Sequence, residues 1–217
     1  MALLRIYHKI DLMVGVWKIE ETIDELRNLF KHFELYEEGL SRFTSEKRKL
    51  EWLAVRALLK ELLYGEEKEI AYHPSGRPYL VDGSGGISFS HTKGYVAVAY
   101  SPYEDVAIDI EHYSDRVRKV AHKFIRPDEQ PSIQRAEDEL TGLLLHWCAK
   151  ETLYKLIDTP GIDFLKDFLI FPCTPLEGGS VKGYVFLPEK EALHYIDYMT
   201  TPDYMLTYAT IPWPRKR

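Results

Sequence analysis

Twice along this chain, a long segment with helical spacing of apolar residues precedes a series of short strand-like runs. The first helical segment runs from Ser45 to Leu63 and the second from Ala136 to Ile157, before the stop signal of Pro160 and Gly161. Runs rich in β-branched and aromatic residues favour strands. They are ISFSH, YVAVAY and VAIDIE after the first helix, and DFLIF, GYVFL and YMLTYAT after the second. This order predicts the α+β fold class.

The repeated order also suggests an internal duplication. We expect two similar α+β subdomains, residues 1–102 and residues 103–217, related by a pseudo-twofold axis with an active site at their interface. No linker rich in Gly, Pro or Ser separates the halves, so we expect them to pack directly against each other. The alternative is that any α+β protein repeats helices and sheets, and the order of elements alone does not choose between the two.

The composition is that of a soluble globular protein. Of the 217 residues 45% are hydrophobic and 29% charged, which argues against disordered and fibrous classes. The net charge of −6 argues against a general nucleic-acid coat. Arg5, His8 and Lys9 interrupt the first apolar runs, so we expect neither a signal peptide nor a membrane span. With two cysteines, which do not make a disulfide framework, a cytoplasmic protein is the simpler expectation.

Two carboxylates share one face of the expected strand VAIDIE. The alternation of side chains along a strand sends Asp109 and Glu111 to the same side, with Cα atoms about 6.6 Å apart. Such a pair repels itself unless something positive compensates it, and it can converge on one hard cation. The alternative is a solvated outer face of the sheet with two harmless acids.

A second charged group continues the apolar stripe of the second helix. Steps of three and four residues from Leu144 and Trp147 reach Glu151 and Lys155. Charges in line with a tryptophan suggest a functional role, although an ordinary ion pair four residues apart at a helix end would give the same pattern. Lys150 points about 100° away from Glu151 around the helix.

Several basic residues have only weak signals individually. His91 ends the run SFSH and can hydrogen-bond a phosphate oxygen or simply cap a turn. Arg77, between Gly76 and Pro78, can hold a phosphate or simply be exposed, and the same ambiguity applies to basic residues of the first helix. Within residues 112–126, five basic residues face one acid, a local charge of +4: Arg116, Arg118, Lys119, Lys123 and Arg126, against Asp115.

Taken together and in this order, the motifs resemble those of the 4'-phosphopantetheinyl transferase superfamily. GRPYL followed by SFSH looks like its G-(K/R)-P and S-H elements, and VAIDIE looks like its G-I-D-I-E element. KFIRPDE and HWCAKETLYK look like F-x-x-x-x-E and W-x-x-K-E-x-x-x-K. The length, with all blocks in one chain, resembles the long pseudo-dimeric, surfactin-synthetase-activating-like branch. The motifs span Gly76 to Lys155, and each motif is weak without the others.

The chain departs from the family pattern at two positions. Ala107 replaces the usual Gly before Ile-Asp, and Thr152 replaces the more usual Ala or Ser after Lys-Glu. Ala107 adds a methyl group on the face that carries the acids, which can alter the approach of a metal or phosphate.

The resemblance implies a reaction and a set of roles. Coenzyme A would donate its phosphopantetheine arm to a serine of an apo acyl or peptidyl carrier protein, releasing adenosine 3',5'-bisphosphate. Asp109, Glu111 and Glu151 would hold Mg²⁺, or Mn²⁺, since an oxygen site accepts both. Lys155 would stabilise charge on the pyrophosphate or leaving group. The serine proton would go to Glu151, or to a water held by Glu151 or Glu129.

The remaining roles concern the two substrates. By resemblance, Ser90 and His91 bind the phosphate region of coenzyme A, Lys150 contacts phosphate or forms a local salt bridge, and arginines hold the 3'-phosphate: Arg77 with Arg48 or Arg56. Carrier proteins of fatty acid, polyketide and nonribosomal peptide synthesis are typically acidic, so the segment with Arg116, Arg118, Lys119 and Lys123 would dock them. We expect a monomer with no nucleic-acid or membrane partner. The alternatives are a non-catalytic coenzyme A or carrier-protein binding protein of the same fold, and another Mg²⁺-dependent phosphotransfer enzyme.

Overall fold

The computed structural model describes residues 3–9, 11–133 and 138–213, and the chain divides into two compact units. The first unit comprises Met1–Val106 with Ile211–Arg217, and the second comprises Ala107–Thr210. Each unit combines helices with an antiparallel sheet, so the mixed α and β architecture expected from the sequence is confirmed. The pseudo-twofold relation between two subdomains stays a prediction.

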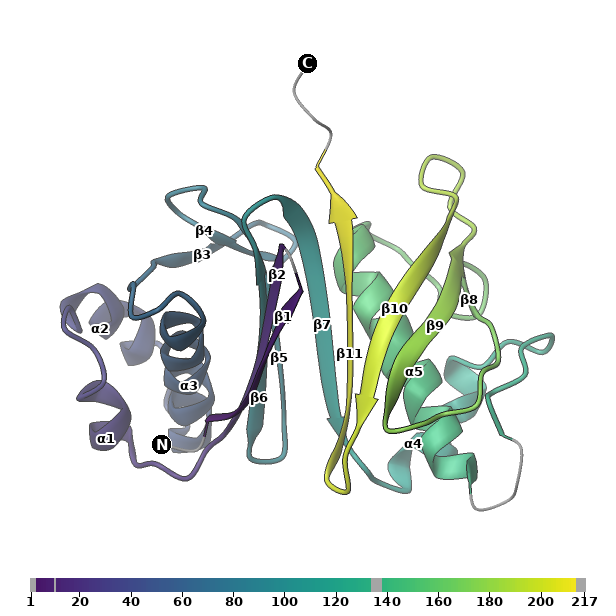
Figure 1. Cartoon of the computed structure of the whole chain (residues 1–217), viewed down its shortest axis with the longest axis horizontal. Helices are drawn as coiled ribbons and strands as arrows, with labels where there is room; N and C mark the ends of the chain where they lie inside the picture. Colours follow the sequence, from purple (N-terminus) through teal and green to yellow (C-terminus); the bar gives the residue numbers. More distant parts are fainter. Residues whose placement is uncertain (1–2, 10, 134–137, 214–217) are drawn as a thin grey trace. The chain divides into compact units, whose positions relative to one another are not determined.

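The first unit is built on a four-stranded sheet with the order β1-β2-β6-β5. Its strands are β1 (Leu3–Lys9), β2 (Leu12–Lys18), β5 (Gly86–Thr92) and β6 (Tyr95–Ser101). Helix α3 (Glu46–Leu62) packs on β2 and β6, and two short helices, α1 (Ile23–Arg27) and α2 (Glu34–Ser41), lie beside α3 (Figure 1). A small hairpin joins β3 (Ile70–Tyr72) to β4 (Pro78–Leu80).

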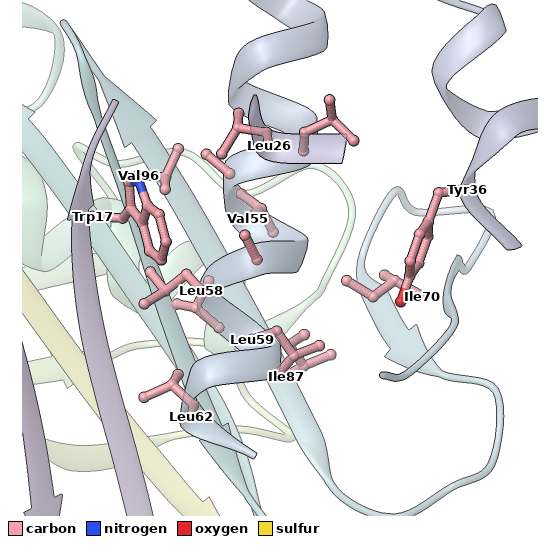
Figure 2. Close-up of a cluster of buried hydrophobic side chains, with 14 of the residues drawn as sticks. Trp17, Leu26, Tyr36, Val55, Leu58, Leu59, Leu62, Ile70, Ile87 and Val96 are labelled. Atoms are coloured by element: carbon pink, nitrogen blue, oxygen red, sulfur yellow. The ribbon is translucent and has the colours of Figure 1, made fainter. Parts of the chain in front are cut away.

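The core of the first unit lies between α3 and the sheet (Figure 2). Leu58 and Leu62 of α3 are fully buried near Trp17 and Val96. Burial of each leucine contributes about 2 kcal/mol. A Cβ atom at Gly15 of β2 would come within 2.7 Å of Leu58 Cδ1, so this glycine allows the helix its close approach.

The second unit is built on a five-stranded sheet with the order β7-β11-β10-β9-β8. Its strands are β7 (Glu104–His112), β8 (Phe168–Ile170), β9 (Gly178–Val185), β10 (Ala192–Thr200) and β11 (Tyr204–Pro212). Helix α5 (Glu139–Ile157) packs against β8, β9 and β10 (Figure 1). The short helix α4 (Arg116–Val120) and a 3-10 turn (Ala121–Lys123) follow β7, and α4 packs on α5.

Local patterns predicted the long elements and missed several short ones. The expected strands ISFSH and YVAVAY are confirmed as β5 and β6, which pair antiparallel with Gly94 at φ +77° in the turn between them. The second helix is confirmed from Glu139, while its expected first residue, Ala136, lies outside the described residues. No sequence pattern predicted β1, β2, α1, α2 or β10. Among the described residues, no helix has the length and apolar character that a membrane crossing requires.

Candidate active site

Strand β7 places a carboxylate inside the second unit. All residues from Val106 to Ile110 are buried, so neither face of this part of the strand is open to solvent. Asp109 is only 4% exposed, and Glu111 is partly buried one step further along the same face. The alternative of a solvated face with two harmless acids is therefore wrong for Asp109.

Helix α5 brings Lys155 to this carboxylate. The Lys155 ammonium lies 2.8 Å from Asp109 Oδ1 and donates a second hydrogen bond to the backbone oxygen of Ile108, also at 2.8 Å. One turn earlier lies Glu151, and Trp147 Nε1 donates to Glu111 Oε1 at 3.2 Å. The stripe of Trp147, Glu151 and Lys155 that helical spacing predicted therefore faces the acids of β7.

Glu111 and Glu151 both have raised pKa values beside Asp109. Burial, together with the charges of Asp109 and Glu111 and against the opposing charge of Lys155, raises the pKa of Glu151 to about 7. Burial, followed by the charge of Asp109, also raises the pKa of Glu111. Acids in this state oppose further negative charge and favour a cation. A shifted carboxyl group beside a lysine in a cavity is typical of an active site.

The donor set suits a divalent cation such as Mg²⁺. This ion takes hard oxygen ligands and commonly uses one or two carboxylates together with substrate phosphates and waters. Asp109, Glu111 and Glu151 supply such oxygens, and their mutual repulsion falls when a cation is added. In the described part of the chain, no three histidine, cysteine, aspartate or glutamate side chains are arranged to hold a metal by themselves. If these acids hold a cation, substrate phosphates and waters would have to supply its other ligands.

Glu129 and Lys150 lie apart from solvent and pair with each other. Lys150 Nζ lies 2.6 Å from Glu129 Oε2 and also donates to the backbone oxygens of Phe124 and Phe164. The other oxygen of Glu129 lies 2.6 Å from His146 Nδ1. The side chains of Glu129, Lys150 and His146 are all 0% exposed. Of the two possibilities for Lys150, the structure shows the local salt bridge.

In the first unit, Arg48, Glu51 and His91 form a second charged group. Arg48 Nη1 donates to His91 Nε2 at 2.6 Å and lies 3.2 Å from Glu51 Oε2, which is itself 3.4 Å from His91 Nε2. Glu51 is buried whereas Arg48 and His91 reach solvent, and Ser90 precedes His91 on β5 with 8% exposure. The structure thus brings together Arg48 and His91, which the sequence proposed from separate motifs.

Arg77 lies elsewhere in the first unit. It pairs with Asp105 Oδ1 at 2.9 Å, and Trp213 Nε1 donates to the same oxygen at 3.0 Å. These three residues line a cavity of about 280 Å³. Sequence reasoning missed Asp105 and Trp213, since 108 residues separate them.

Arg56 occupies a different environment from the other arginines. Its guanidinium lies 3.2 Å from the centre of the Trp52 ring and donates to the Trp52 backbone oxygen. Only 4% of the residue is exposed, and burial lowers the pKa of Arg56 to about 10. It stabilises the interior by stacking and presents no open guanidinium to a ligand.

Basic residues after β7 surround a cavity of the second unit. This cavity, of about 690 Å³, is lined by Arg116 and Lys123 together with Glu111, Glu151 and Trp147. Arg118 lies nearby in sequence but is engaged, because it pairs with Asp115 and donates from Nε to Glu139 at 2.6 Å. Lys119 is exposed on the same short helix. The acids and part of the basic segment therefore share one cavity.

Comparison with known families identifies the region that carries this site. The family model described as the 4'-phosphopantetheinyl transferase superfamily matches residues 105–209, which include β7 and α5. No curated protein matches the chain.

Proposed function

We propose that this chain transfers the 4'-phosphopantetheine arm of coenzyme A to a serine of an apo carrier protein, because residues 105–209 match the family model of the 4'-phosphopantetheinyl transferase superfamily. The other product is adenosine 3',5'-bisphosphate. The match to this superfamily supports a transferase activity. We assign it to the long branch, as a holo-[acyl-carrier-protein] synthase, because the first unit also carries the G-R-P and S-H elements.

One observation carries the proposal: Asp109 of β7 meets Lys155 of α5, with Glu111 and Glu151 alongside. Phosphoryl transfer needs stabilisation of charge on several oxygens rather than an elaborate covalent apparatus. A lysine that pairs with one acid, beside two acids that favour a cation, supplies that stabilisation. This geometry supports the proposed roles because it requires two elements separated in sequence to converge.

We assign separate roles to a bound cation, to Lys155 and to Glu151. When bound, Mg²⁺ or Mn²⁺ would neutralise pyrophosphate charge and polarise the phosphoryl oxygens. Lys155, fixed by Asp109 and the Ile108 backbone oxygen, holds its ammonium group for the charge that develops on the leaving group. Glu151 is the general base that we favour, because it lines the cavity that also contains Arg116 and Lys123. Glu129 supports this role less well, since both of its oxygens already have buried partners.

Coenzyme A contacts are proposed for the exposed basic residues of the first unit. Arg48, His91 and Arg77 carry side chains that reach solvent and can donate to phosphate oxygens, and Ser90 adjoins His91. Arg56 leaves this set because it is buried on Trp52. Lys150 is also excluded from this set, because Glu129 and two backbone oxygens already accept hydrogen bonds from its ammonium group.

Carrier-protein docking is proposed for the basic segment after β7. Arg116 and Lys123 line the cavity that also contains Glu151, and Lys119 is exposed nearby, so an acidic partner would be drawn toward the reacting groups. Lys119→Glu with Lys123→Glu should raise the KM for carrier protein, and salt should weaken binding to the unmodified chain. The control is Lys182→Glu, which reverses an exposed charge on β9. An unchanged KM for carrier protein in the double variant would remove the docking role.

The decisive test is intact-mass spectrometry of an apo acyl carrier protein incubated with this chain, coenzyme A and Mg²⁺. We expect the carrier to gain one phosphopantetheine group, and expect Glu151→Gln to lose at least about 100-fold in rate, the range for a general base. Glu191→Gln serves as the matched control, because this exposed glutamate lies far along the chain on the β9–β10 connection. Binding of coenzyme A without transfer to any of several carrier domains would instead favour a non-catalytic binding protein.

A further inference from the structure

A second group of reactive side chains lies away from Asp109 and Lys155, around the loop that precedes α5. Ser132 Oγ is 2.8 Å from His146 Nε2, and the other ring nitrogen, Nδ1, is 2.6 Å from Glu129 Oε1. A serine, a histidine and a carboxylate are thus joined in series through opposite nitrogens of one ring. This is the order in which a base activates a serine and a third group orients the base.

The hydrogen bonds fix the direction of proton movement. A carboxylate only accepts, so His146 Nδ1 carries the proton toward Glu129 and leaves Nε2 as an acceptor in the neutral ring. Burial lowers the pKa of His146, which keeps the ring neutral near pH 7. The Ser132 hydroxyl then donates to Nε2, while its oxygen accepts from the Cys173 backbone N–H at 3.0 Å. The histidine is therefore in the state that a general base requires.

The backbone at Ser132 is strained. Its φ is +25°, a conformation that L side chains rarely adopt and that glycine accepts more easily. The loop is held close to α5 at Gly142, where a Cβ atom would come within 2.9 Å of the backbone oxygen of Ser132. A strained residue persists only where its surroundings enforce it, and such residues concentrate at functional sites.

A cavity of about 580 Å³ opens over this serine. Its lining includes Glu129, Ser132, Ile133 and Cys173, with Pro131 and Pro172. Among the described residues of the lining, Glu129 is the charged side chain, and it is already paired with Lys150 and His146. The size suits a small organic molecule, and a described lining whose charge is already paired favours an uncharged one.

We propose that Ser132 is a nucleophile and that this cavity accepts a small uncharged carboxylic ester, which the chain hydrolyses. Ser132 Oγ forms a bond to the acyl carbon as its proton passes to His146 Nε2. The bond from that carbon to the leaving oxygen then breaks, and the proton from Nε2 passes to the departing alcohol. The Cys173 N–H, already directed at Oγ, is a donor for the negative oxygen of the intermediate.

Water completes the reaction. It gives a proton to His146 Nε2 as its oxygen attacks the acyl group, the acid leaves, and the proton returns to Ser132 Oγ. The sum is ester plus water giving acid plus alcohol, with no other reactant. Lys150 shares the charge of Glu129, which weakens the support that the carboxylate gives to a charged His146, so we expect slow turnover.

The test uses the full chain and two probes. A fluorophosphonate, which phosphonylates activated serines, should label Ser132, as read by peptide mass spectrometry. Hydrolysis of p-nitrophenyl acetate should fall about 100-fold in Ser132→Ala and in His146→Gln, the range for loss of a general base. Thr174→Val is the control, because Thr174 lines the same cavity. Ser132→Gly provides a second variant that removes the hydroxyl and relieves the backbone strain.

The outcomes separate this activity from phosphopantetheine transfer. Labelling of Ser132 and loss of hydrolysis in both Ser132 variants, with carrier modification retained, would support a second site. A folded chain that takes no label at Ser132, or Ser132→Gly that hydrolyses the ester as fast as the unmodified chain, would overturn the proposal. Failure of carrier modification alone would affect only the proposed transferase function.

Discussion

Two lysines of helix α5, Lys150 and Lys155, each pair with a carboxylate from another segment, and the two pairs differ in how completely their charges are compensated. Lys150 and Glu129 are 0% exposed and fully occupied by His146 and two backbone oxygens. Lys155 and Asp109 instead adjoin Glu111 and Glu151, two further acids with raised pKa values. We call Lys150, Glu129 and His146 the closed group, because its charges and hydrogen bonds are partnered within the group or by backbone oxygens. We call Lys155, Asp109, Glu111 and Glu151 the open group, because it has more negative charge than its lysine compensates. The charges of Lys150 and Glu129 therefore need no ligand to compensate them, whereas the acids around Lys155 favour a positively charged ligand.

Breaking the closed group should have the largest effect. Lys150→Met keeps the length of the side chain but leaves the buried carboxylate of Glu129 without its main partner. We expect a loss of about 3 to 5 kcal/mol in the free energy of unfolding. Chemical denaturation measures it, with Lys182→Met, at an exposed position, as a control expected within about 0.5 kcal/mol. Equal losses in the two variants would mean that the pair contributes no more than a surface charge.

Removing the acid Glu151 from the open group should raise the free energy of unfolding. The pKa of Glu151 is raised from 4.5 to about 7, so the folded chain binds this proton more tightly than the unfolded chain. The resulting penalty grows as pH rises from about 4.5 to about 7 and is constant above. Glu151→Gln should therefore stabilise the chain by about 2 to 3 kcal/mol at pH 8 and by little at pH 4.5. Thermal unfolding at both pH values checks this, and a destabilised variant at pH 8 would contradict it.

In the closed group, the contribution of His146 to stability should fall as pH falls, whereas the penalty from Glu151 becomes smaller. Burial lowers the pKa of His146 below 6.5, so the unfolded chain takes up this proton first as pH falls. Its contribution to stability is complete above about pH 6.5 and declines below it, by at most about 1.4 kcal/mol per pH unit. His146→Gln keeps both hydrogen bonds possible but cannot titrate. The difference in unfolding free energy between the two proteins should shrink with falling pH, and a constant difference would refute this assignment.

Sequence periodicity predicted the open group better than the closed one, for a physical reason. Asp109 and Glu111 follow the alternation of one strand, and Glu151 and Lys155 follow the turn of one helix, so each half is encoded locally. Lys150 is encoded by the same helix, but its partner Glu129 comes from an irregular loop 21 residues earlier. No period links a loop to a helix, and the pairing is decided by tertiary packing.

The same reasoning explains what sequence patterns missed elsewhere. Arg56 has the spacing of a surface arginine, but the stacking on Trp52 that buries it depends on how α3 packs in the first unit. Ser132 stands in a segment with no strand or helix pattern, and its contact with His146 arises because the loop crosses α5 at Gly142. A histidine in the apolar helical run LLLHWCA was the available signal, since a buried histidine requires polar partners.

The smallest expected effect is the stabilisation of the folded chain by Mg²⁺, which should depend on the open group and not on the closed group. Mg²⁺ that binds the folded chain alone should raise its stability by about 1.4 kcal/mol at ten times the dissociation constant. Glu151→Gln should reduce this gain, because one ligand and its charge are lost, while Lys150→Met should retain it, because its defect lies in the closed group. Thermal unfolding with MgCl₂, against NaCl at equal ionic strength, measures the three proteins. An equal gain in all three would mean that the ion binds outside the acids of β7 and α5, and the charge excess around Lys155 would then need another ligand.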